Sequence, residues 1–80
     1  MIGTGGSQPR SLSDIKAGEI VRLFSVLGGE QFKERMVAMG LSPGISFEVV
    51  RNRAGGPVVL SIRGARLILG RGMSHKIMVT

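Results

Sequence analysis

Apolar residues in the second half of the chain alternate with polar ones in short runs. In the runs 45–50 and 58–63, every second residue is a large apolar one, which is typical of half-buried β-strands. Two further short runs, 65–69 and 76–80, complete this set, and a run rich in β-branched residues, 20–27, precedes it. The apolar residues of 20–27 do not alternate strictly, so we expect part of that strand to be covered on both faces.

One segment has a helical period instead. Phe32, Met36 and Met39 lie at positions i, i+4 and i+7, which places them on one face of a helix spanning about 30–39. We expect this face to plug the core beneath the strands. The alternative is that its methionines form an adaptable hydrophobic stripe for docking.

Glycine, proline and capping residues mark the ends of these elements. Gly40 is expected to end the helix in a left-handed conformation, with Leu41 folding back onto its last turn. The segment 42–44, Ser-Pro-Gly, has the composition of a tight turn, and the pair 63–64, Arg-Gly, that of a hairpin turn. The segment 11–14 predicts a capped single turn of helix.

Five short strands and one helix are too few for a β-sandwich. They favour a mostly β fold with one or two short helices (α+β), in which a small, strongly bent barrel hides its own edges. The first ten residues are rich in glycine and small polar residues, so we interpret 1–10 as a flexible leader. Residues 11–80 are then one domain.

The charge of the chain narrows the possible partners. Eleven Lys and Arg against five Asp and Glu give a formal charge of +6, and no acidic residue follows Glu48. We therefore predict that the exposed strands bind an acidic partner, with candidate binding residues Arg51, Arg53, Arg63 and Arg66. Nucleic acid, anionic lipid and an acidic protein surface all fit such a surface, as does a merely solvated face.

Two features limit the partner further. The chain contains three Phe and neither Tyr nor Trp, so platforms for stacking single-stranded bases are scarce and no specific nucleic acid is expected. No apolar run approaches the roughly 18–20 residues of a membrane span, and the N-terminus lacks the features of a secretory signal. We expect a cytoplasmic protein that does not insert into membranes.

The sequence contains few residues of the kinds that catalysis or metal binding requires. His75 is the only histidine, cysteine is absent, and no nucleophile set is evident, so we predict neither an enzyme nor a cofactor. The co-ligands open to His75 would be carboxylates such as Asp14, Glu19 or Glu48, and the neighbouring Lys76 disfavours a cation. No metal site is predicted.

Several segments together are similar to one known family. They are 12–19 (Leu-Ser-Asp-Ile-Lys-Ala-Gly-Glu), 35–44 (Arg-Met-Val-Ala-Met-Gly-Leu-Ser-Pro-Gly), 56–58 (Gly-Pro-Val), Gly64, Leu69 and 77–79 (Ile-Met-Val). In this order and spacing they resemble the ferrous iron transport protein A (FeoA) family over about 11–80. The resemblance implies an SH3-like barrel in the cytoplasm, acting with the large membrane transporter of ferrous iron as an accessory protein. It further implies a likeness to the C-terminal domain of metal-dependent repressors.

One segment departs from that family. Residues 70–74 read Gly-Arg-Gly-Met-Ser where many relatives carry acidic residues, so no metal role is transferred to them. The function predicted is binding and modulation of the cytosolic domain of the ferrous iron transporter. A basic nucleic-acid-binding barrel and a transition-metal sensor are the alternatives, and the oligomeric state is left open.

Overall fold

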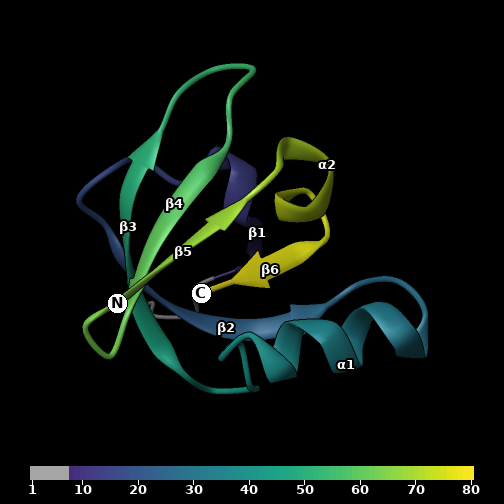
Figure 1. Cartoon of the computed structure of the whole chain (residues 1–80). Helices are drawn as coiled ribbons and strands as arrows, with labels where there is room; N and C mark the ends of the chain where they lie inside the picture. Colours follow the sequence, from purple (N-terminus) through teal and green to yellow (C-terminus); the bar gives the residue numbers. More distant parts are fainter. Residues whose placement is uncertain (1–7) are drawn as a thin grey trace, which may run out of the picture.

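The computed structural model describes residues 8–80, which form a mostly β domain with short helices (Figure 1). The elements, in chain order, are β1 (Arg10–Ser11), the 3-10 helix η1 (Leu12–Asp14), β2 (Ile20–Val26), α1 (Glu30–Ala38), β3 (Ser46–Asn52), β4 (Val58–Ile62), β5 (Ala65–Leu69), α2 (Arg71–Ser74) and β6 (Ile77–Val79). The predicted fold class is confirmed, and the fold is an SH3-like barrel.

The strands form one antiparallel sheet in the order β1-β6-β2-β3-β4-β5. Strand β2 belongs to both halves of this sheet, because its first residues pair with β3 and its last residues pair with β6. Its register shifts between Leu23 and Ser25, and that of β3 shifts between Val49 and Arg51. Such bulges bend a strand, which allows the sheet to curl around a single core.

The alternation predicted for the later strands is confirmed. Val49 of β3, Leu60 of β4 and Ile77 of β6 are fully buried, whereas the two residues on either side of each of them are exposed or partly exposed. One cluster contains all the buried apolar side chains of the described residues, including Met36 of α1 and Leu41 just after its end. The barrel therefore has a single core.

Strand β2 departs from the prediction. Val21 and Leu23 are buried, but Ile20 and Phe24 on its other face are 75% and 57% exposed. The expectation that part of this strand is covered on both faces is wrong for Ile20 and Phe24, because the barrel packs against only one face of β2 there. Apolar residues on the second face look the same in sequence whether or not a neighbour covers them.

The end of α1 follows the predicted pattern. Gly40 has φ 106°, and its N–H donates to the carbonyl of Val37 at 3.0 Å. The N–H of Leu41 donates to the carbonyl of Met36 at 2.8 Å, which completes a Schellman motif, and the Leu41 side chain is fully buried. This local chemistry turns the chain sharply from α1 towards β3.

Only part of the predicted helix face enters the core. Met36 is fully buried and Phe32 is half-buried, with the Lys76 ammonium 5.0 Å from the centroid of its ring. Met39 is 37% exposed because α1 ends at Ala38 and Met39 is its C-terminal cap. The prediction that Met39 packs in the core is therefore wrong.

Both predicted turns are confirmed. The Ile45 N–H donates to the Ser42 carbonyl at 3.1 Å, and Gly44 between them has φ 84°, as position i+2 of a type II turn requires. Arg63 and Gly64 have φ 51° and 84°, so they form a type I′ turn, the kind that matches the twist of a two-residue hairpin.

The N-terminal strand was not predicted. Strand β1 begins at Arg10 and pairs with β6, while residues 1–7 of the predicted leader lie outside the described residues.

The Glu19 carboxylate makes two polar contacts with the N-terminal segment. The Lys16 N–H donates to it at 2.8 Å, and Arg10 pairs with it at 3.1 Å. These two contacts lower the pKa of Glu19. Their stabilisation is present above the ordinary pKa of the carboxyl and is lost as pH falls through the lowered value.

Replacing Met36 by Asp should unfold most of the protein at room temperature. Met36 is fully buried, so the variant places an unpaired charge in the core, at a cost of about 3–5 kcal/mol. Thermal unfolding followed by circular dichroism measures the loss. Val37→Asp is the matched control, because Val37 is 50% exposed on the same helix and its variant should keep its melting temperature within a few degrees. An unchanged melting temperature for Met36→Asp would contradict the packing described for α1.

Candidate partner-binding surface

Two of the four predicted binding arginines share one face of the sheet. Arg51 of β3 lies opposite Val59, and Arg66 of β5 lies opposite Ser61. Directly opposed residues point to the same side of a sheet, and the neighbouring Leu60 faces the core. Arg51 and Arg66 therefore lie on the outer face of β3, β4 and β5, and both are exposed.

The other two arginines lie at opposite ends of β4. Arg53 lies in the loop before β4, and Arg63 lies in the turn after it. The four arginines thus extend along the whole β3–β5 hairpin region rather than converging on a single site. The acid Glu48 is in the same cross-strand row as Arg66, with Ser61 between them, so the outer face is not uniformly basic.

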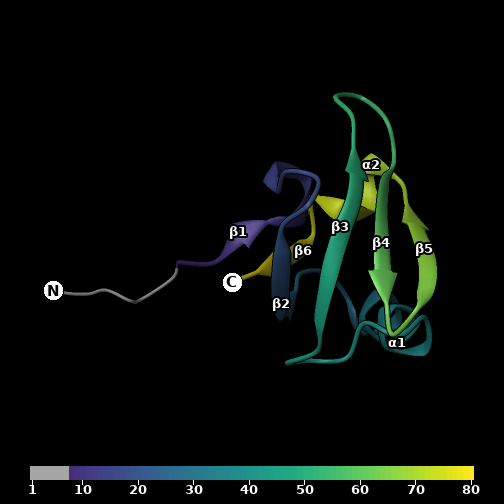
Figure 2. The same ribbon diagram turned by 90° about the vertical axis from the view of Figure 1, so that its left-hand side faces the viewer.

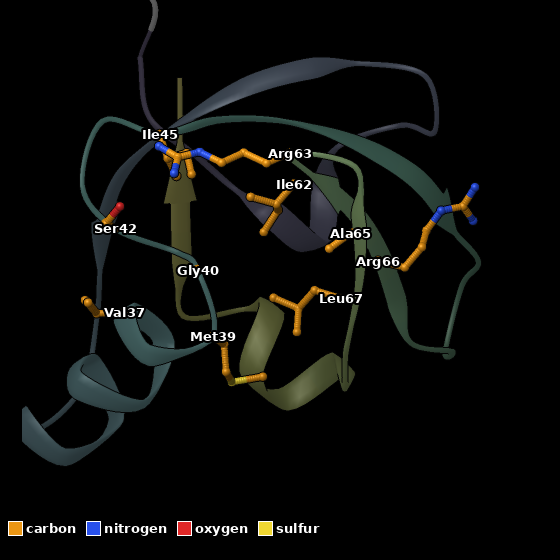
Figure 3. A pocket seen from close by; sticks show the side chains of 10 residues that line it. All are labelled: Val37, Met39, Gly40, Ser42, Ile45, Ile62, Arg63, Ala65, Arg66 and Leu67. Carbon is orange, nitrogen blue, oxygen red and sulfur yellow. The ribbon is translucent and has the colours of Figure 1, made fainter.

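A pocket of about 460 Å³ lies between the β4–β5 hairpin and the C-terminal end of α1. Most of its side chains are apolar, and two of the predicted arginines lie at its margin (Figure 3). Its lining residues are Val37, Met39, Gly40, Ser42, Ile45, Ile62, Arg63, Ala65, Arg66 and Leu67. In Figure 3 the Arg63 side chain extends along the rim towards Ile45, whereas Arg66 points away from the other lining residues.

The lining of this pocket combines exposed apolar side chains with two arginines. Its apolar members include Val37 and Met39, which are 50% and 37% exposed. An apolar side chain of a partner would bury them, while the two guanidinium groups would attract carboxylates beside it. No acid or histidine is among the lining residues.

The pocket contains residues that our sequence reasoning did not assign to a binding site. Ile45, Ile62 and Leu67 were predicted only as strand residues, and their convergence with α1 depends on the tertiary fold. A signal existed only for Met39, because a docking stripe was the alternative interpretation of the helix face. Its exposure and its place in the pocket support that alternative for Met39 alone.

Arg71 has an internal role and does not belong to this surface. Its guanidinium donates to the carbonyl of Gly56 at 3.1 Å, to the carbonyl of Ser13 at 3.1 Å and to Asn52 Oδ1 at 2.8 Å, with a further bond to the Arg53 carbonyl. Asn52 in turn donates to backbone carbonyls of the η1 segment. This network joins α2, the β3–β4 loop and the N-terminal segment.

The single histidine takes part in a different polar contact. His75 Nδ1 lies 3.0 Å from the hydroxyl of Ser13, which also contacts the hydroxyl of Ser11 at 2.7 Å. Within residues 8–80, no three His, Asp or Glu side chains gather in a way that could hold a metal ion. No helix of that same part of the chain is long and apolar enough to cross a membrane.

The family model of the FeoA domain matches residues 10–80, which is nearly the whole chain. This protein belongs to the FeoA family. An archaeal relative from Methanocaldococcus jannaschii, which carries the provisional name Fe(2+) transport protein A, is 38% identical over 68 residues, covering 85% of this chain and 82% of its own. The resemblance found in sequence is thereby confirmed, and with it the family's involvement in Fe(2+) transport.

Solved structures agree with this membership. The crystal structure of an iron uptake regulatory protein (FeoA) superimposes on this FeoA-family chain with a TM-score of 0.83 at 30% identity, covering 90% of this chain and 96% of the other. A manganese-dependent transcriptional repressor in complex with manganese gives the same TM-score at 20% identity, with 94% of this chain matched to 37% of the repressor. The second likeness concerns the fold alone.

Arg71→Ala should destabilise the domain by about 2–3 kcal/mol, because it removes several charge-assisted hydrogen bonds, including the one that Arg71 donates to the part-buried Gly56 carbonyl. Arg71→Lys should recover little of this, since an ammonium group cannot reproduce the planar fork. Urea denaturation measures both variants. The matched control is Arg66→Ala, which removes an exposed arginine and should change stability by less than about 0.5 kcal/mol. Equal losses for Arg66→Ala and Arg71→Ala would contradict the internal role of Arg71.

Ferrous or zinc ions at micromolar concentration should shift the melting temperature little. A site bound at a hundred times its Kd would stabilise the fold by about 2.7 kcal/mol, which thermal unfolding detects readily. The control is His75→Ala, which removes the only imidazole of the chain. A large stabilisation by metal that disappears in His75→Ala would establish a site that the donor geometry does not indicate.

Proposed function

We propose that this FeoA-family protein is a non-enzymatic, cytoplasmic accessory protein that binds the cytosolic part of a membrane ferrous iron transporter and modulates it. The observation that carries this proposal is the apolar pocket with Arg63 and Arg66 at its margin, on a small barrel that offers no catalytic set among its lining residues. Such a surface suits a protein partner that provides both apolar side chains and carboxylates.

A barrel of this size acts on a transporter only through binding free energy. If it prefers one conformation of the cytosolic part, it shifts the population towards that conformation by the difference between its two affinities. A tenfold preference corresponds to about 1.4 kcal/mol. The predicted effect on transport is therefore graded, and it depends on the concentration of the accessory protein.

The four arginines have a steering role in this proposal. Arg51, Arg53, Arg63 and Arg66 extend from one end of β4 to the other, so they create a broad positive field rather than one tight anion site. Such a field mainly accelerates association with an acidic surface. Arg63 and Arg66, which also line the pocket, are expected to contribute to the lifetime of the complex as well.

The nucleic-acid alternative receives less support from the same surface. Of the three Phe, Phe47 is buried, Phe32 is half-buried beneath Lys76, and Phe24 is 57% exposed. One exposed ring cannot stack successive bases, so binding to nucleic acid would rest on charge alone and fall steeply with salt. The metal-sensor alternative is supported only by the fold shared with the manganese-dependent repressor. Within residues 8–80, no cluster of potential metal ligands supports it.

The test is a paired titration at about 50 and 200 mM salt, with the transporter's cytosolic domain and with mixed-sequence oligonucleotides as partners. The transporter complex should associate more slowly at the higher salt and still form, because it also buries apolar surface. Oligonucleotide binding should be weak, without sequence preference, and largely lost at the higher salt. Salt-resistant binding to oligonucleotides with none to the transporter domain would overturn the proposal.

Substitutions can distinguish the effect of the four arginines from the effect of overall net charge on association. Changing the four arginines Arg51, Arg53, Arg63 and Arg66 to Gln should reduce the association rate with the transporter domain roughly tenfold at low salt. The matched control changes four other exposed cations to Gln, namely Lys16, Arg22, Lys33 and Arg35, and so loses the same charge. Equal effects of the two variants would show that net charge, and not the β3–β5 surface, directs the association.

A further inference from the structure

Strand β5 is an open edge of the sheet. It pairs with β4 alone, and Figure 2 shows it at the outer side of β3 and β4. The prediction that the barrel would hide its own edges is therefore wrong for this strand. Edge strands in natural proteins are commonly protected by proline, bulges or charged side chains, and β5 has a regular register, no proline and a single charged residue, Arg66.

The register identifies which backbone groups face outwards. A two-residue turn joins Ile62 to Ala65, so these two residues form a hydrogen-bonded pair, and the pairs then alternate along the hairpin. Arg66 and Ile68 consequently belong to non-hydrogen-bonded pairs. Their N–H and C=O groups point away from β4, and within residues 8–80 no other strand pairs with them.

The side chains of β5 connect this edge to the pocket. Arg66 and Ile68 lie on the outer face, where Ile68 is 62% exposed. Ala65 and Leu67 line the pocket between β5 and the end of α1, and Leu69 is buried. A strand added along β5 would thus place alternate side chains at the pocket and beside Arg66.

We propose that β5 accepts an extended, acidic segment of the partner as an additional strand, with an apolar side chain in the pocket and carboxylates beside Arg63 and Arg66. The proposal rests on the proposed function in so far as the segment belongs to the transporter. Backbone hydrogen bonds supply affinity in this mode of recognition, and the alternate side chains supply specificity. The pocket wall formed by Val37 and Met39 selects the apolar side chain.

Charge decides between a foreign acidic segment and a second copy of this chain. Two β5 edges paired antiparallel would bring the Arg66 side chains of both copies close together on the same face, and no acidic residue of β5 is available to compensate them. Like charges across a strand pair destabilise it, whereas opposite charges stabilise it. An alternating acidic and apolar segment matches both faces of β5.

The first experiment uses the peptide acetyl-Glu-Val-Glu-Leu-Glu-Val-amide, which alternates acidic and apolar residues. Titrated into the isotope-labelled protein, it should shift the amide signals of Arg66 and Ile68 and slow their hydrogen exchange. A peptide with Lys in place of Glu should bind about tenfold more weakly or not at all, and so should one with Ser in place of Leu. Shifts confined to other elements, or equal binding of the Lys peptide, would overturn the proposal.

The second experiment removes an outward-facing hydrogen-bond donor of β5 while keeping its pairing with β4. Ile68→Pro eliminates an outward N–H that β4 does not use, a place where an edge strand tolerates proline, and it should weaken the peptide about tenfold or more. Ile68→Thr is the matched control, because it keeps the N–H and the β-branched shape and should lose little. Val37→Glu is independent of β5: it adds a negative charge at a half-exposed pocket wall and should also weaken the acidic peptide.

The same variants, tested on the transporter's cytosolic domain, separate this inference from the proposed function. Weaker binding of Ile68→Pro and Val37→Glu to both the peptide and the domain supports the edge site. If the domain binds the wild type and both variants equally, the edge site is refuted while the proposed function stands. If the peptide protects Arg66 and Ile68 but the domain does not bind, the edge site stands and the proposed function fails. Protection of β5 that grows with protein concentration alone would refute the acidic segment in favour of a second copy.

Discussion

The architecture depends on strand β2, which pairs with both β3 and β6. Its first residues pair with β3 and its last with β6, and the bulge between Leu23 and Ser25 bends it where the pairing changes. A domain this short can build only one core, so the sheet must curl until both halves face the same apolar cluster. The packing of Met36 and the placement of α1 under the barrel follow from that curvature.

A polar network complements this core at the other end of the barrel. The Arg71 guanidinium and the Asn52 amide bind backbone carbonyls from η1 and the β3–β4 loop, which neither strand ladder satisfies. Arg71, one of the six cations that follow Glu48, is engaged in these internal hydrogen bonds. Net charge alone therefore overstates how many cations of the C-terminal half are exposed to an acidic partner; those of the β3–β5 hairpins are Arg51, Arg53, Arg63 and Arg66.

The same geometry produces the surface for which we propose partner binding. Curling the sheet around one core leaves β5 as an edge and brings its inner residues against the end of α1, where the cap at Gly40 turns the chain away and leaves a pocket. Exposed backbone groups of β5, an apolar pocket and two arginines, Arg66 in β5 and Arg63 in the turn before it, thus lie close together.

Local chemistry in the sequence determined β2 to β6, α1, the Schellman cap at Gly40 and the turn at 63–64, because each depends on residues a few positions apart. Family resemblance gave the barrel type, and its segments were matched over nearly the whole chain. The tertiary structure alone decided which apolar residues stay exposed, such as Phe24 and Met39. It also decided that Arg71 forms internal hydrogen bonds, whereas Arg63 and Arg66 lie at the margin of a pocket. Those outcomes depend on contacts between residues far apart in the chain, and neither period nor composition encodes which face of a strand another element will cover.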